Sequence, residues 1–169
     1  MTISVIIPTI GRDQLPRAVA SVAVQLQPGD EILILRDETG DSGNTPRDDA
    51  TKRAKGTHLW FLDDDDVACK RALTAMREAA DEHPKALCCF KMLYGKKSEA
   101  PGMILWERKS VEPGQLGTPC CLIPNLPNLP LWTEANDELI FSDIRYLMKV
   151  AARCRDVVWF EDVVAHIRP

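Results

Sequence analysis

The sequence predicts an α/β fold, in which a mostly parallel central sheet forms a single domain. Short apolar, β-branched runs alternate with helical segments in the first half of the chain, as they do where helices connect parallel strands. The chain has 169 residues, of which 45% are hydrophobic and 27% are charged. One globular domain with its own core fits these values, whereas extended disorder, collagen and a disulfide scaffold do not.

The first half of the chain supplies four predicted strands and three predicted helices. Asp13 can cap the first helix, in which Leu15, Val19, Val22 and Leu26 share one face. Pro28 and Gly29 end that helix. The strands are expected at residues 3–8, 31–35, 58–62 and 86–93, and the later helices at 47–55 and 70–82.

The second half of the chain has a looser pattern. MILWER (103–108) and CCLI (120–123) are predicted strands, and PNLPNLPLW (124–132) is a loop because it carries three prolines. An amphipathic helix is expected at 142–154, followed by a short strand at 157–160. We expect the inward face of the helix at 142–154 to comprise Ile144, Leu147, Met148 and Ala151.

Charge and cysteine content exclude several classes of protein. The formal net charge is −4, and the aspartates at 63–66 carry that amount alone, so no broad nucleic-acid surface is indicated. None of the six cysteines forms a C-x-x-C pair, which excludes a zinc ribbon or a thioredoxin-like motif. Buried, reduced thiols and the absence of a long apolar segment indicate a cytoplasmic protein without a membrane span.

Polar residues follow three of the predicted strands, at 8–12, 37–41 and 63–66. Ligands of open α/β sheets bind beyond the carboxyl ends of the strands, so we expect these segments to converge. The four adjacent aspartates would repel one another unless a cation offset their charge. Oxygen ligands suit Mg²⁺ or Mn²⁺, and Mg²⁺ is usually shared with substrate phosphates, so the run predicts a metal–diphosphate site.

The stretch RDDATKRAKGTHLWFLDDDD (47–66) resembles family 2 glycosyltransferases of the GT-A fold. In that family an Arg opens a helix, a Gly follows, and an aromatic-rich strand leads into an Asp-x-Asp motif. VIIPTIGR (5–12) resembles the opening strand and its turn, and RDETGD (36–41) lies where the family has an acidic loop. The resemblance implies one GT-A domain over 1–169, with a nucleotide-sugar half (1–95) and an acceptor and catalytic half (96–169).

The resemblance also implies roles for single residues. Mn²⁺ or Mg²⁺ is the expected cofactor, and a UDP-sugar is the expected donor. Asp65 would bind the metal, and His166 lies where related enzymes place a histidine near it. The residues expected to bind the donor are Pro8 and Thr9 at the nucleotide, Arg12 and Arg47 at the phosphates, Asp37 at the base, and Asp63 or Asp64 at the ribose.

Asp143 matches the family's general base, a carboxylate at a helix start, and Ser142 before it can cap that helix. We expect the helix dipole to keep Asp143 ionised. Ser142 replaces the family's usual Glu, and Arg36 replaces the first Asp of the acidic loop. Other candidate bases are Glu134, Asp137 and the pair Glu161–Asp162. Trp132 is expected either in the core or stacked on a sugar.

The resulting hypothesis is a metal-dependent, inverting glycosyltransferase that acts on an acceptor hydroxyl. The acceptor is left open among a glycan, a lipid-linked sugar, a protein and a modified nucleic acid, and a homodimer is possible for so short a chain. One alternative is a nucleotidyltransferase, which would normally carry a Gly-rich, lysine-bearing loop after the first strand, where PTIGRDQLPR has one glycine and no lysine. The other is a degenerate, non-catalytic nucleotide-binding domain.

Overall fold

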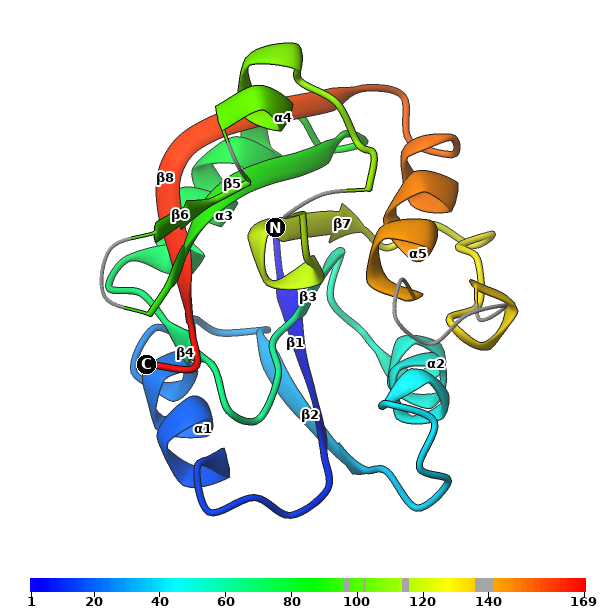
Figure 1. Ribbon diagram of the computed structural model, residues 1–169. Coiled ribbons are helices and arrows are strands. Elements are labelled where there is room, and N and C mark those ends of the chain that lie inside the picture. Colours follow the sequence, from blue (N-terminus) through cyan, green and yellow to red (C-terminus); the bar gives the residue numbers. More distant parts are fainter. Residues whose placement is uncertain (96–97, 102, 114–115, 136–141) are drawn as a thin grey trace.

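A computed structural model describes residues 1–95, 98–101, 103–113, 116–135 and 142–169 (Figure 1). The strands are β1 (Ile3–Thr9), β2 (Glu31–Arg36), β3 (His58–Phe61), β4 (Val67–Ala68), β5 (Leu87–Tyr94), β6 (Ser98–Ala100), β7 (Cys121–Pro124) and β8 (Val157–Ile167). The helices are α1 (Leu15–Ala23), α2 (Asn44–Arg53), α3 (Ala72–Glu82), α4 (Met103–Arg108) and α5 (Ser142–Ala151), with short 3₁₀ turns η1 (Thr118–Cys120) and η2 (Thr133–Ala135).

The strands form one sheet in the order β2-β1-β3-β7-β5-β8-β4, and β6 pairs with β5. The three longest pairings, β1 with β2, β1 with β3, and β5 with β8, are parallel. The predicted α/β class with a mostly parallel sheet is therefore confirmed. In Figure 1, α1 and α2 lie to either side of β1 and β2, and β8 curls around the upper part of the sheet. Among the described residues, no helix combines the length and apolarity that crossing a bilayer requires.

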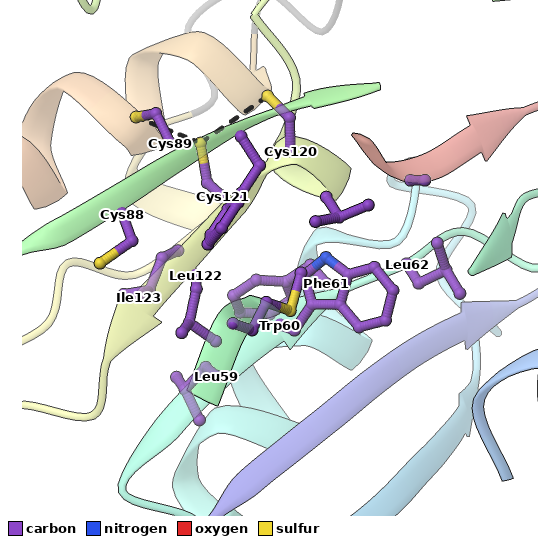
Figure 2. Close-up of a cluster of buried hydrophobic side chains, with 14 of the residues drawn as sticks. Leu59, Trp60, Phe61, Leu62, Cys88, Cys89, Cys120, Cys121, Leu122 and Ile123 are labelled. Atoms are coloured by element: carbon purple, nitrogen blue, oxygen red, sulfur yellow. Dashed lines mark hydrogen bonds between the residues drawn. The ribbon is translucent and has the colours of Figure 1, made fainter. Parts of the chain in front are cut away.

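Burial explains why the central strands are mostly apolar. Every residue of β1, β3 and β7 is buried, because both faces of these strands are covered. Figure 2 shows side chains of β3 and β7 packed together in this core, beside buried cysteines. All six cysteines are free, and four are buried. Burial raises the pKa of the Cys88 thiol to about 12, so it remains a protonated, apolar side chain.

Several predicted boundaries were wrong. Helix α1 begins at Leu15 without a side-chain cap, so Asp13 does not cap it, and Leu26 lies beyond its end. Helix α2 begins at Asn44, before the expected residue 47. Strand β2 is only partly buried because it is the edge of the sheet. Strand β8 extends to Ile167, well past the expected end at 160, because it pairs with β5 and then with β4.

Two predictions in the second half of the chain also need correction. Residues 103–108 form α4 and not a strand, and Met, Leu, Glu and Arg in that segment are good helix formers. Helix α5 buries Ile144 and Leu147 as expected, but Met148 is 45% exposed. Tyr146 and Val150 are buried instead, so the inward face is rotated from the predicted one.

Candidate functional site

The carboxyl ends of β1, β2 and β3 meet at one edge of the sheet, where Thr9 pairs with Arg36 and Ile6 with Phe61. The segments that follow these strands line a first cavity of about 290 Å³. All seven residues that the sequence assigned to donor binding lie in its wall. The lining residues are Pro8, Thr9, Ile10, Arg12, Asp37, Ser42, Gly43, Arg47, Asp63, Asp64, Asp65 and Arg168.

Asp64 holds the loop after β1 in place. Its carboxylate is buried and accepts a hydrogen bond from Thr9 Oγ1 (2.5 Å), and it forms an ion pair with Arg12. Thr9 Oγ1 in turn accepts from the backbone N–H of Gly11 (2.8 Å). The hydrogen bond to Asp64 raises the pKa of Arg12 above its usual value. Asp64 is thus engaged by protein groups, whereas the Asp63 side chain is 39% exposed.

Arg47 is buried at the start of α2 and points at the four aspartates of residues 63–66, which we call the acidic run. Its Nη2 lies 2.6 Å from Asp63 Oδ1, and its Nη1 donates to the carbonyl oxygen of Ser42 (2.8 Å). The guanidinium carbon also lies 4.7 Å from the ring centroid of Trp132. Trp132 is fully buried and stacks on Tyr146 at 4.0 Å, so it belongs to the core beneath Arg47. Of the two roles expected for Trp132, packing in the core and stacking on a sugar, the structure supports packing in the core.

Asp37 organises the loop after β2. Its Oδ1 accepts hydrogen bonds from the backbone N–H groups of Thr39 and Gly40 and from Thr39 Oγ1, and its Oδ2 accepts from the N–H of Gly43 (2.8 Å). Burial alone would raise the pKa of Asp37, but these hydrogen bonds lower it on balance. Because Oδ2 accepts from a single protein group, it retains capacity for a ligand N–H at the cavity wall.

Asp63, Asp65 and Asp66 can each bring one carboxylate oxygen within 4.8 Å of the other two. We call these residues the acidic cluster. Burial, together with the charge of Asp63, raises the pKa of Asp66 to about 7, so a cation here would relieve a real electrostatic cost. Three carboxylate oxygens are a donor set that suits Mg²⁺ or Mn²⁺. The acidic cluster therefore fits a divalent cation.

The two residues assigned to the metal by sequence are placed differently. Asp65 belongs to the acidic cluster, but His166 does not, and its Nε2 lies 2.5 Å from the carbonyl oxygen of Gly95. The sequence analysis included Asp66 in the predicted metal–diphosphate run without giving it a role of its own, and it did not identify Arg168. Arg168 Nε lies 3.3 Å from Asp65 Oδ2, and its backbone N–H donates to Asp66 Oδ1 (3.0 Å). The sequence signal that could have indicated an additional basic residue is the charge of four adjacent carboxylates, which requires nearby cations.

A second cavity, of about 220 Å³, lies on the other side of the acidic cluster. It shares Asp63, Asp65 and Arg168 with the first cavity. Its further lining residues are Asp66, Met92, Tyr94, Gly117, Pro119, Asp143 and Ile167. The candidate base is therefore brought to the same carboxylates as the candidate donor residues, although it lies far from them in the sequence.

Asp143 lies in the first turn of α5 and accepts a hydrogen bond from Thr118 Oγ1 (3.3 Å). Burial raises the pKa of Asp143, and the charge of Asp63 adds to this, although Arg47 opposes it. Loss of hydration therefore opposes the effect expected of the helix dipole, which favours the charged carboxylate, and the ionisation of Asp143 stays a prediction. Ser142 is the first helical residue, and the residue before it lies outside the described part of the chain.

Of the other candidate bases, those that the structure describes do not line this site. Glu134 lines neither cavity. Glu161 forms an ion pair with Lys91 (2.7 Å), and it and Asp162 likewise line neither cavity. Asp137 lies outside the described residues. Asp143 is thus the candidate base that the structure brings to the acidic cluster.

Comparison with solved structures shows a likeness to S. aureus TarS, at 18% identity and a TM-score of 0.74, over 100% of this chain and 37% of that chain. TarS 1-349 in complex with UDP matches at 18% identity and a TM-score of 0.72, over 98% and 60%. Its complex with UDP-GlcNAc matches at 17% identity and a TM-score of 0.68, over 98% and 58%.

The likeness confirms the predicted α/β fold of the GT-A type. This chain spans between 37% and 60% of the length of these TarS chains. A scan against protein-family models matches none, and a search of curated proteins finds no matching relative.

Proposed function

We propose that this chain is a glycosyltransferase that moves a sugar from a UDP-sugar to an acceptor hydroxyl. One observation carries the proposal: two cavities share the carboxylates of Asp63 and Asp65, and they hold the expected donor residues on one side and Asp143 on the other. The same fold binds UDP and UDP-GlcNAc in TarS, which supports a uridine nucleotide as the donor.

In this proposal the nucleotide binds in the first cavity, where Pro8 and Thr9 line the wall. Asp37 Oδ2 accepts a hydrogen bond from the ring N–H of the base. Asp63 binds the ribose hydroxyls, because Asp64 is buried and already bonded to Thr9 and Arg12. Arg12 and Arg47, which both line this cavity, offset the negative charge of the diphosphate.

Asp63, Asp65 and Asp66 would hold Mn²⁺ or Mg²⁺, with Asp66 in the place first assigned to His166. The ion would offset the charge that develops on the leaving diphosphate. Sharing Asp63 between the ribose and the acidic cluster is compatible with its position in both cavity walls.

Asp143 acts as the general base in the second cavity. It takes the proton of the acceptor hydroxyl while that oxygen bonds to the anomeric carbon, and the bond from this carbon to the diphosphate oxygen breaks. Attack from the side opposite to the diphosphate inverts the anomeric configuration. The raised pKa of Asp143 makes its carboxylate a stronger proton acceptor than an exposed aspartate. In the domain division that we propose, residues 1–95 bind the donor and residues 96–169 supply the base.

Binding of UDP and UDP-GlcNAc, measured by calorimetry with and without Mn²⁺, tests this function. Asp65→Ala should abolish the metal-dependent part of UDP binding. Asp143→Asn should bind UDP-GlcNAc like the original protein but release no UDP from it. Asp49→Asn, on the exposed side of α2, is the matched control and should change neither property.

Failure of UDP to bind in the presence of Mn²⁺ would contradict the proposal. Binding of UDP-GlcNAc without any release of UDP, to water or to sugar acceptors, would instead indicate a non-catalytic nucleotide-binding domain. Release of pyrophosphate from UTP in the presence of a sugar phosphate would indicate a nucleotidyltransferase.

A further inference from the structure

We propose that Arg168 is a switch residue, which pairs with Asp65 until the donor diphosphate recruits its guanidinium and leaves Asp65 to the divalent cation. Arg168 would thereby make metal binding and diphosphate binding depend on each other. This inference rests on the proposed function, and it adds a residue to which the sequence analysis assigned no role.

The position of Arg168 supports this. It lines the first and the second cavity, and its Nε lies 3.3 Å from Asp65 Oδ2. It follows the last residue of β8 with a φ of 47°, in the left-handed region, so the chain turns out of the strand at the acidic cluster. Its backbone N–H donates to Asp66 Oδ1 (3.0 Å), which fixes the main chain there while leaving the side chain separate.

The other two arginines at the acidic run are held by additional partners. Arg12 is ion-paired with the buried Asp64 and also lies 3.8 Å from Asp65 Oδ2, and Arg47 is buried between Asp63, Ser42 and Trp132. The Arg168 side chain is 75% exposed, and within the described part of the chain it pairs with Asp65 alone. An exposed ion pair contributes little stability, so this guanidinium can exchange its partner at small cost.

Charge determines the direction of the exchange. A cation bound by Asp65 would lie close to the Arg168 guanidinium, and two positive charges at one carboxylate repel each other. A diphosphate in the first cavity supplies new acceptors on the same wall, and guanidinium groups bind phosphate oxygens through two parallel hydrogen bonds. Because coupling between two ligands is reciprocal, each ligand then favours the binding of the other through Arg168.

The test measures Mn²⁺ affinity without nucleotide, and UDP affinity at saturating Mn²⁺, for three variants. Arg168→Gln should bind Mn²⁺ alone several-fold more tightly than the original protein, because the nearer of the two guanidinium groups at Asp65 Oδ2 is gone and only Arg12 remains. It should bind UDP with Mn²⁺ about tenfold more weakly, as the loss of a charged hydrogen bond predicts. Arg168→Lys retains the charge, so its Mn²⁺ affinity should stay at the original value while its UDP affinity falls.

Arg17→Gln is the matched control. Arg17 donates to the carbonyl oxygen of Pro169 (3.2 Å), so it contacts the same end of the chain. It has no ion pair with the acidic cluster among the described residues, and both affinities should be unchanged. Thermal unfolding without ligands checks that each variant is folded.

A second readout follows Arg168 directly. The side-chain Nε–H resonance of Arg168 in a ¹⁵N-labelled sample should shift when Mg²⁺ is added alone and shift again when UDP follows. Unchanged Mn²⁺ affinity in Arg168→Gln, or an Nε–H resonance insensitive to Mg²⁺, would overturn the switch while leaving the glycosyltransferase proposal intact. Failure of the original protein to bind UDP with Mn²⁺ would instead remove the proposed function.

Discussion

Asp143 illustrates how one residue's surroundings can set its chemistry. Burial raises its pKa, and the hydrogen bond from Thr118 Oγ1 lowers it, so the two effects oppose each other. A base with a raised pKa becomes active only as the pH rises through that value. The proposed reaction should therefore show an ascending limb at a pH above the usual pKa of an aspartate.

Thr118→Val tests this balance. The substitution removes a donor that favours the charged carboxylate, so the pKa of Asp143 should rise further and the ascending limb should move to higher pH. The pH dependence of UDP release from UDP-GlcNAc, in the presence of a sugar acceptor, measures the shift. UDP affinity should stay unchanged, because Thr118 does not line the first cavity. A shift to lower pH would show that Thr118 does not stabilise the charged form.

Gly43 is a residue at which an added methyl group should damage the nucleotide site. Its φ is 82°, and a Cβ there would lie 2.8 Å from Arg47 Nη1 and 3.1 Å from Pro8 Cβ. Gly43→Ala should displace Arg47 and weaken UDP binding by about tenfold or more, a loss on the scale of one charged hydrogen bond. Calorimetry with UDP and Mn²⁺ measures the change.

Gly40 provides the control for backbone strain. Its φ is 70°, but a Cβ there would meet nothing within 4 Å. Gly40→Ala should therefore carry a similar conformational penalty with little loss of UDP affinity. Equal losses in both variants would mean that loop strain, and not the position of Arg47, determines binding.

At the residue scale, the sequence predicted the members of the first cavity but not their partners. Arg12, Arg47 and Asp64 could be assigned from a family pattern, because that pattern records residue types at fixed spacing. Which aspartate pairs with which arginine could not be assigned, because the four adjacent aspartates cannot be distinguished from one another in the sequence. Asp64 is buried and Asp63 is half-exposed only because Thr9 and Arg12 approach one and not the other.

At the element scale, Asp48 connects α2 to the proline-rich loop. This buried carboxylate accepts hydrogen bonds from the backbone N–H of Trp132 (2.7 Å) and from the N–H and Oγ1 of Thr133. It therefore fixes the segment that places Trp132 beneath Arg47. The partners are 84 and 85 residues away in the sequence, so no local pattern could indicate them.

Asp48→Ala should lower the free energy of unfolding by about 2–4 kcal/mol, because it leaves buried N–H donors without an acceptor. Urea unfolding measures the change. Asp49→Ala is the matched control, since the side chain of the neighbouring Asp49 is 44% exposed and, among the described residues, pairs with Lys52 at 3.5 Å; it should cost well under 1 kcal/mol. Comparable losses in the two variants would contradict the anchoring role of Asp48.

The elements that were predicted well are those with both faces covered. Strands β1 and β3 are short, mostly apolar runs rich in β-branched or aromatic residues, a composition that favours a strand buried on both faces. The segment 103–108 was assigned to the wrong element because it is short, and its apolar and charged residues fit a strand or one turn and a half of helix. The choice between helix and strand for this segment depends on its packing against neighbouring elements, which the local sequence does not show.

At the scale of the whole molecule, the order of the sheet brings the two halves of the chain to one site. Strand β7 lies between β3 and β5, and it is antiparallel to both. The alternation of strands and helices predicted the parallel part of the sheet but not this insertion. The local sequence does not encode between which strands a later strand pairs. The insertion brings η1, and with it Thr118, to the side of Asp143.

His58 should make the stability of the whole fold depend on pH. It lies in β3 and is 3% exposed, and burial, together with the positive charge of the N-terminus, lowers its pKa from 6.5 to about 4. The unfolded chain therefore binds a proton between pH 6.5 and 4 that the folded chain does not bind. By linkage, the stability that the neutral His58 contributes is fully present above pH 6.5 and is lost as the pH is lowered towards 4, by on the order of 3 kcal/mol. The raised pKa of Asp66 acts in the opposite direction over this range, so the contribution of His58 is measured as the difference between the original protein and a His58 variant.

His58→Gln removes the titrating group, so it should remove this part of the acid sensitivity, although it should also lower stability somewhat at pH 8 through imperfect packing. Urea unfolding of both proteins at a series of pH values from 8 to 4 measures the difference. His83→Gln is the control, because the His83 side chain is 40% exposed, and its pH profile should follow that of the original protein. If His58→Gln lost stability in acid as steeply as the original protein, this buried imidazole would not be responsible for the sensitivity between pH 6.5 and 4.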